Sequence, residues 1–87
     1  MSAQEIRDHI QREYIEPARN RGRKTVRIRA GDIHDEMELK SLQPLVCDTL
    51  TNNVIQQQYN IKLIKQESGG KVHQKHGKNI WYTYQLL

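Results

Sequence analysis

The chain has 87 residues, of which 14 are lysine or arginine and 10 are aspartate or glutamate, so its formal net charge is +4. A chain this short favours one small domain over residues 1–87 and leaves little room for both a core and an enclosed catalytic cavity. No apolar run reaches the roughly 18 residues of a membrane span, Met1–Gln11 lacks the apolar stretch of a secretory signal, and the single cysteine excludes an internal disulfide, which fits a cytoplasmic protein.

Charge is distributed unevenly along the chain. Residues 19–29 carry six basic side chains and no acidic one, residues 32–48 carry five acids against one lysine, and residues 62–78 carry five lysines against one glutamate. The order is therefore basic, acidic, basic. A basic balance favours a polyanionic partner, and clustering strengthens that indication.

The N-terminal segment predicts a helix over Ala3–Glu16. Ser2 and Glu5 have the spacing of a capping box, and Ile6, Ile10 and Tyr14 recur at helical spacing. Pro17 is expected to end or kink this helix, because proline lacks an N–H and restricts the residue before it. In the second case helical character resumes over Ala18–Arg21.

Gly22 is a stop signal, and strict alternation over Lys24–Ala30 predicts a half-buried strand with Val26, Ile28 and Ala30 on one side. A short helix is expected next, over Asp32–Leu39. Ser41 is a candidate N-cap for a third helix, with Pro44 in its first turn.

The apolar stripe of this third helix, Ser41–Asn52, consists of Leu42, Leu45, Val46 and Leu50, and Val54 continues it at the same spacing. A break at Asn52 would leave a short extra turn over Val54–Tyr59. Two strands complete the chain, Ile61–Lys65 and Asn79–Leu86. In the first of them Ile61 and Leu63 are expected to point one way, and Lys62 and Ile64 the other.

The order helix, strand, helix, helix, strand, strand resembles the winged helix-turn-helix family of DNA-binding domains. The resemblance implies an α+β fold with three helices and a small three-stranded antiparallel sheet. The residues that carry it are Thr25–Ala30 as the small strand, Asp32–Leu39 and Ser41–Asn52 as the helix-turn-helix, and Ile61–Gln66 with Ile80–Leu86 as the wing strands. The segments Thr25–His34 and Pro44–Cys47 also resemble small stand-alone archaeal proteins of unassigned function, which implies no activity.

In this family the third helix usually enters the major groove. The resemblance therefore implies nucleic-acid contacts by Lys40, Ser41, Gln43, Thr49 and Asn52. The sequence departs from the family pattern, because the third helix contains Asp48 and no arginine. Phosphate attraction supplies most non-specific affinity, so an acidic third helix works against the usual docking mode.

The basic segments supply the other candidate contacts. These residues lie in the loop before the first strand, on that strand and in the wing: Arg19, Arg21, Arg23, Lys24, Arg27, Arg29, Lys71, His73, Lys75 and Lys78. The alternative is a solvated loop, a solvated strand face and a polar hairpin tip.

Catalysis and metal binding find little support. His73 and His76 have the spacing of a metal pair, but surface histidines on a hairpin are the plainer interpretation. Cys47 is flanked by apolar helix positions, which indicates that it is a small buried residue. A cysteine nucleophile would need a paired general base, and the sequence indicates none. The acids around Asp35 match no known cation loop. We therefore expect no enzymatic activity, no metal and no cofactor.

The aromatic residues near the C-terminus alternate along the last strand. Tyr82 and Tyr84 are expected in the core, whereas Trp81 lies on the opposite face, either simply exposed or available to stack on a base.

The sequence is compatible with three functions. The first is binding of double-stranded DNA, as a small transcriptional regulator or chromatin-associated protein. The second is RNA binding through the same basic surface. The third is a protein-interaction module that docks a basic partner on the acidic segment 32–48.

Overall fold

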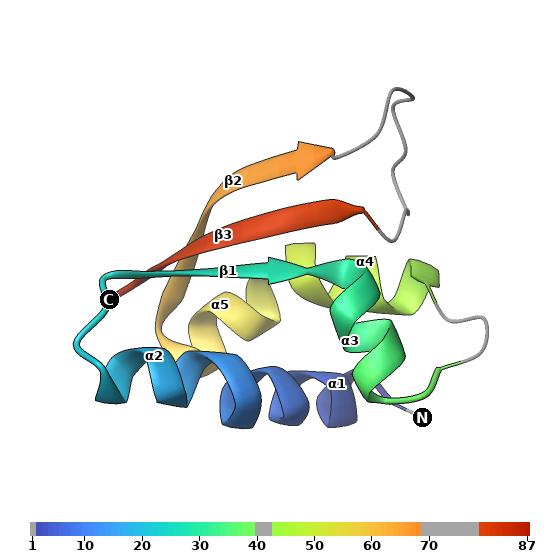
Figure 1. The fold of residues 1–87 in the computed structure, drawn as a ribbon, viewed down its shortest axis with the longest axis horizontal. Helices are drawn as coiled ribbons and strands as arrows, with labels where there is room; N and C mark the ends of the chain where they lie inside the picture. Colours follow the sequence, from blue (N-terminus) through green and yellow to red (C-terminus); the bar gives the residue numbers. More distant parts are fainter. Residues whose placement is uncertain (1, 40–42, 69–78) are drawn as a thin grey trace.

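The computed structural model describes residues 2–39, 43–68 and 79–87. These residues form an α+β fold in which helices cover one face of a three-stranded antiparallel sheet (Figure 1). None of the described helices is both long and apolar enough to cross a membrane. The elements in chain order are α1 (Ala3–Ile10), the π-helical turn η1 (Gln11–Ile15), α2 (Glu16–Asn20), β1 (Thr25–Arg29), α3 (Ala30–Glu36), α4 (Gln43–Thr51), α5 (Asn53–Tyr59), β2 (Ile61–Ser68) and β3 (Ile80–Leu86).

The first helical segment continues through Pro17 to Asn20, so of the two expected effects of Pro17 it does not end the helix at Glu16. The predicted N-cap is confirmed, because the Ser2 side chain accepts a hydrogen bond from the Glu5 N–H. Just before the proline the helix widens into η1, where the Glu16 N–H donates to the carbonyl of Gln11. A proline ring clashes with the carbonyl four residues earlier in a regular α-helix, and the wider turn accommodates it.

Gly22 ends this segment as predicted. Its φ of 70° lies in the left-handed region, which glycine adopts without steric cost. The Arg23 N–H donates to the Ala18 carbonyl at 3.0 Å, and the Gly22 N–H to the Arg19 carbonyl at 3.0 Å. This pair of bonds is the Schellman arrangement that closes a helix C-terminus. The turn leaves Arg21 and Arg23 on either side of Gly22.

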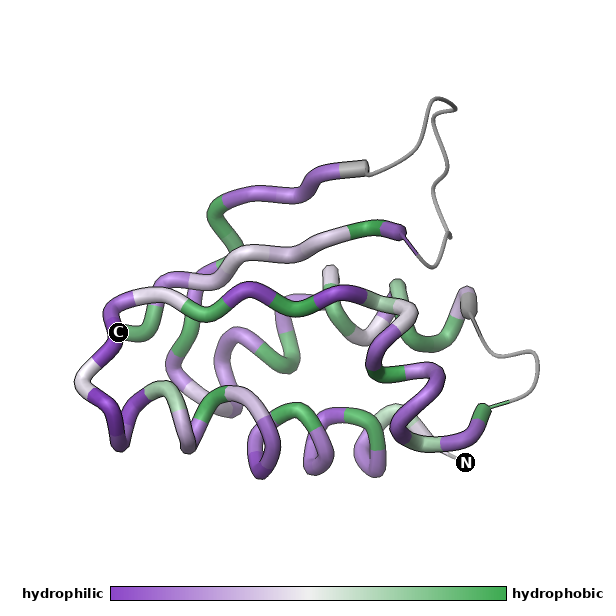
Figure 2. Tube along the Cα trace, in the orientation of Figure 1, coloured by the Kyte–Doolittle hydropathy of each residue, from purple (hydrophilic) through white to green (hydrophobic). Residues whose placement is uncertain are grey.

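The three strands form one sheet in the order β1-β3-β2. All three predicted strands are present, but β1 ends at Arg29 and β2 extends beyond Lys65 to Ser68. Ala30, predicted as the end of the first strand, instead begins α3, which ends at Glu36 and not at Leu39. Hydrophilic and hydrophobic residues alternate along β1 (Figure 2), where Ile28 is buried and Arg27 is exposed. The β2–β3 register shifts between Leu63 and Lys65, so Ile64 is an extra residue in β2 and is half exposed.

The described ranges contain four helical segments rather than three, since α5 is a separate helix. Asn52 has an extended backbone and its side chain accepts a hydrogen bond from the Val54 N–H, which caps α5. This break resets the helical phase. As a result Ile55 is buried and Val54 is 45% exposed, so Val54 does not continue the stripe of α4 as the sequence suggested.

The core lies between the sheet and the helices. Cys47 and Leu39 are buried as expected, whereas Val26, Leu45 and Leu63 are partly buried. The fully buried large side chains are Ile6, Ile10, Ile15, Ile28, Ile33, Val46, Leu50, Ile55, Ile80, Tyr82 and Tyr84.

Two buried tyrosines of β3 differ in one hydrogen bond. The Tyr84 hydroxyl donates to the backbone carbonyl of Leu50, one of the last carbonyls of α4, which have no partner within their helix. The Tyr82 hydroxyl faces the Cys47 thiol, a weak hydrogen-bonding group, and burial followed by this contact raises the pKa of Tyr82.

We expect Tyr84→Phe to lower the free energy of unfolding by about 1–3 kcal/mol, because it strands a buried carbonyl. Tyr82→Phe removes a buried hydroxyl that faces only the weakly hydrogen-bonding Cys47 thiol, so stability should stay nearly unchanged or rise. Urea unfolding of the two variants compares positions of the same strand and face. Equal losses of unfolding free energy in the two variants would contradict the role given to the Tyr84 hydrogen bond.

Candidate nucleic-acid interface

The face of the sheet turned away from the helices carries most of its charged side chains. Register places these outward residues in three rows across the strands: Thr25, Gln85 and Lys62; Arg27, Thr83 and Lys65; and Arg29, Trp81 and Glu67. The bulge at Ile64 brings Lys65 onto this face, because it sets Lys65 rather than Ile64 opposite Thr83.

Arg27 is held in a cluster on this outer face. Its guanidinium lies 4.1 Å from the centre of the Trp81 ring, a cation–π contact. Its Nη2 is 3.6 Å from Oε1 of Glu67, and the other carboxylate oxygen of Glu67 is 3.5 Å from Nζ of Lys65. One carboxylate therefore compensates, in part, the charges of Arg27 and Lys65.

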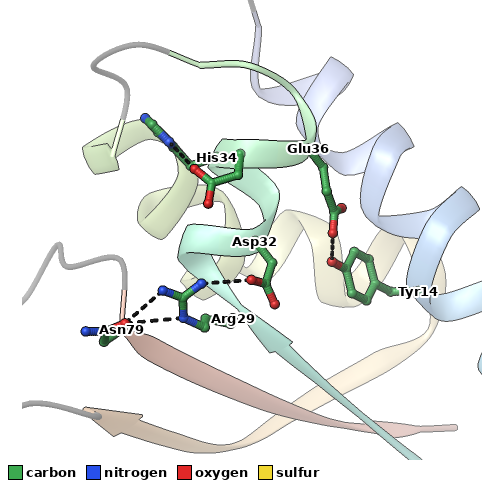
Figure 3. A network of polar contacts seen from close by, with 7 residues as sticks. Tyr14, Arg29, Asp32, His34, Glu36 and Asn79 are labelled. Carbon is green, nitrogen blue, oxygen red and sulfur yellow. Dashed lines mark hydrogen bonds and ion pairs between the residues drawn. The ribbon is translucent and has the colours of Figure 1, made fainter.

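Arg29 links β1 to α3 and to the start of β3 (Figure 3). Its Nη1 donates to Asp32 Oδ1 at 2.8 Å, and its Nη2 donates to Asn79 Oδ1 at 2.8 Å. The side chain is 25% exposed and its charge is paired. We assign Arg29 a structural role, so it is a poorer phosphate ligand than its sequence position suggested.

Arg19 is likewise committed to the fold. Its Nη2 donates to the carbonyls of Tyr59 and Asn60 at 2.7 and 2.9 Å. These carbonyls lie at the C-terminal end of α5, where a cation is favourable. The prediction that Arg19 contacts phosphate is therefore replaced by a helix-capping role.

Four cations remain exposed at one end of the sheet, and we call them the basic end group: Arg21, Arg23, Lys24 and Lys62. Their side chains make no hydrogen bond or ion pair with another residue of the described ranges. Lys24 lies beside β3 through a 2.8 Å bond from the Leu86 N–H to its carbonyl, and Lys62 pairs with Gln85. None of these four charges is paired by a contact within the described ranges.

A surface groove runs between the first helical segment and β1. Its volume is about 330 Å³. Pro17, Ala18 and Val26 contribute apolar lining, and Arg21, Arg23 and Arg27 contribute cations. Glu13 is the acid in its lining, and it pairs with Arg12 at 3.4 Å. The groove therefore extends the basic end group toward Arg27.

The helix that the family resemblance favours is poorly suited to contact DNA. Thr49 is only 2% exposed, and its hydroxyl donates to the Leu45 carbonyl at 2.7 Å, so its predicted contact role is wrong. Asn52 is exposed but caps α5. The exposed positions of α4 include Pro44, Asp48 and Thr51.

Several predicted contacts fall where the structure gives no side-chain position. Gln43 begins α4, but its side chain is not described. The remaining predicted residues lie outside the described ranges: Lys40, Ser41, Lys71, His73, Lys75 and Lys78.

Glu36 is an acid with a structural task. Its carboxylate accepts from the Tyr14 hydroxyl at 2.5 Å (Figure 3), and its other oxygen lies 2.7 Å from Nε2 of His9. Burial, and then the bond to Glu36, raises the pKa of Tyr14. These contacts fasten α3 to the first helical segment and remove one acid from the candidate protein-docking surface.

No group of three or more potential metal ligands occurs in the described part of the chain. Cys47 is buried, and burial raises the pKa of its thiol, which favours the unreactive neutral form.

Lys62 belongs to the site, although sequence reasoning did not include it. Alternation placed it on the outer face, but only the order of the strands brings β2 and the loop before β1 to the same end of the sheet.

Comparisons with family models, curated proteins and solved structures find no match to this chain.

Proposed function

We propose that this protein binds double-stranded DNA, and that the basic end group is its main contact with the phosphate backbone. The observation that carries the proposal is the set of exposed, uncompensated cations Arg21, Arg23, Lys24 and Lys62 at one end of the sheet. Cations already paired inside a protein gain less from phosphate, because they must give up a partner. The proposal covers a small transcriptional regulator or a chromatin-associated protein.

The finer fold proposal is a winged helix-turn-helix. Two short helices, α3 and α4, come after β1, and the sheet order β1-β3-β2 joins β2 and β3 as antiparallel neighbours. This arrangement supports a helix-turn-helix followed by a wing. The separate helix α5 between α4 and β2 is a departure from three helices.

Salt dependence tests the proposal on the unmodified protein. Four phosphate contacts predict a slope of about −3.6 for log affinity against log salt, or a loss on the order of a hundredfold between about 50 and 200 mM salt. Titrating a labelled duplex by anisotropy at several salt concentrations gives the slope. Absence of binding at low salt, or a slope shallower than about −1, would contradict the proposal.

Asp48 distinguishes the proposed contact from docking through α4. Asp48 is exposed on α4, a helix that contributes no residue to the basic end group. We expect Asp48→Asn to change duplex affinity by less than about twofold. If α4 entered the major groove, removing this negative charge would strengthen binding severalfold at low salt.

The second candidate function is a protein-interaction module. The observation that favours it is the acidic surface around α3 and α4, where Asp35, Glu38 and Asp48 are exposed. A basic partner protein would then bind this surface, and Asp48→Asn would weaken that complex. In this case the protein would bind no nucleic acid.

A further inference from the structure

The outer face of the sheet is left uncovered by the helices, which lie together against the opposite face (Figure 1). Trp81 is the single tryptophan of the chain and points to this outer face, since its neighbours Ile80 and Tyr82 are buried. Its indole is partly exposed in the middle strand of an otherwise polar face.

The ring of Trp81 presents a flat surface that another planar group already uses. The Arg27 guanidinium lies 4.1 Å from the ring centre, and it is held there by Glu67 at 3.6 Å. A nucleobase is planar like a guanidinium and can occupy the same surface. Base–aromatic stacking is generally stronger than a cation–π contact at an exposed site, so exchange is favourable.

The charges around Trp81 suit a strand that carries phosphates on both sides of a stacked base. Arg27 lies on β1 and Lys65 on β2, and each is directly opposite Thr83 of the middle strand. Lys62 adds a further cation two residues along β3, opposite Gln85. Glu67 is the acid of these outward rows, so the face is complementary to a polyanion.

We infer that the outer sheet face binds a single nucleic-acid strand by stacking an unpaired base on Trp81, while Arg27 leaves the ring to contact a neighbouring phosphate. Bases within a duplex have their faces covered by their neighbours, so only an unpaired base can stack in this way. This site goes beyond the proposed duplex contact, because it uses an aromatic residue, Trp81, and a different form of nucleic acid.

Glu67 sets the affinity of this site. Its carboxylate holds Arg27 over the ring and repels an incoming phosphate. Removing its charge should free Arg27 and Lys65 together, since both pair with the same carboxylate.

The decisive comparison uses two oligomers with the same number of phosphates. One is oligo-dT, and the other is an abasic strand of equal length. With the unmodified protein we expect quenching of Trp81 fluorescence by oligo-dT and an affinity for it at least about fivefold above that for the abasic strand. Oligo-rU serves as the RNA counterpart, and a preference over its own abasic strand supports the inference equally. Equal affinity for oligo-dT and the abasic strand, or unchanged Trp81 fluorescence, would show that only phosphates are bound. Either result would overturn the inference of base stacking.

Two substitutions locate the site. Trp81→Leu should abolish the preference for oligo-dT over the abasic strand. Trp81→Phe should retain part of this preference, because phenylalanine keeps an aromatic ring. Anisotropy of the labelled oligomer measures both affinities. Glu67→Gln should raise oligo-dT affinity severalfold, and a decrease would count against the inference.

Circular dichroism and thermal melts check that the variants keep the fold. Duplex binding by the Trp81 variants should be unchanged, so failure of the duplex proposal and failure of this inference give different results.

Discussion

Leu50→Ala should lower the free energy of unfolding by about 2–5 kcal/mol, the usual range for a leucine that is fully removed from solvent. Leu50 is 0% exposed, and its own carbonyl receives the Tyr84 hydroxyl from β3. It thus lies where α4 meets the sheet. Truncation leaves a cavity among large side chains that the surrounding helices can fill only in part.

Val54 supplies the control for this experiment. It is an aliphatic residue that the sequence pattern placed on the same stripe, yet it is 45% exposed at the start of α5. Val54→Ala should change stability by less than about 0.5 kcal/mol. Chemical denaturation of both variants measures the difference. Comparable losses at the two positions would mean that α4 and α5 form one continuous helix, contrary to the structure.

Neutralising the whole basic end group should have the largest effect on nucleic-acid binding. Replacing Arg21, Arg23, Lys24 and Lys62 together by glutamine removes four exposed charges without removing a described hydrogen bond or ion pair. The slope of log affinity against log salt should flatten by up to about 3.6, since each phosphate contact contributes about 0.9. Binding to all duplex sequences should weaken alike, because phosphate contacts carry no sequence information.

Arg12 and Arg23 form a matched pair for the same titration. Arg12 lies on the first helical segment with a 66% exposed side chain, and its ion pair is with the adjacent Glu13. Arg12→Gln should leave the slope unchanged, whereas Arg23→Gln should flatten it by up to about 0.9. Equal effects of the two substitutions would show that net charge, and not the basic end group, determines binding.

Sequence pattern predicted the strands and most helices because each has a periodicity of its own. The alternation around Ile28 indicated which side of β1 is buried, and the stop at Gly22 was predicted from one residue type. Cys47, Tyr82 and Tyr84 were correctly placed in the core by the same phase argument.

The errors arose where a local irregularity changes the phase of the next stretch of helix or strand. Pro17 is accommodated by a π-helical turn, which pattern reasoning does not anticipate. The extended backbone of Asn52 exposes Val54, and the bulge at Ile64 places Lys65 on the outer face. Each depends on how one residue is inserted or capped, and hydrophobic spacing alone does not encode that.

Charge clustering identified the basic segments but not the task of each cation. Arg19 caps α5 and Arg29 ties β1 to α3, because carbonyl and carboxylate partners come within reach only in the folded chain. The same fold brings Lys62 to the end of the sheet where Arg21, Arg23 and Lys24 lie.

The most direct test of the proposed interface is to map amide chemical shifts while a short DNA duplex is added at low salt. We predict that the largest changes occur at residues 21–27 and at Lys62, with small changes along α4. If the largest changes instead fall on α4, residues 43–51, the third helix is the DNA-binding element and the basic end group is a solvated surface.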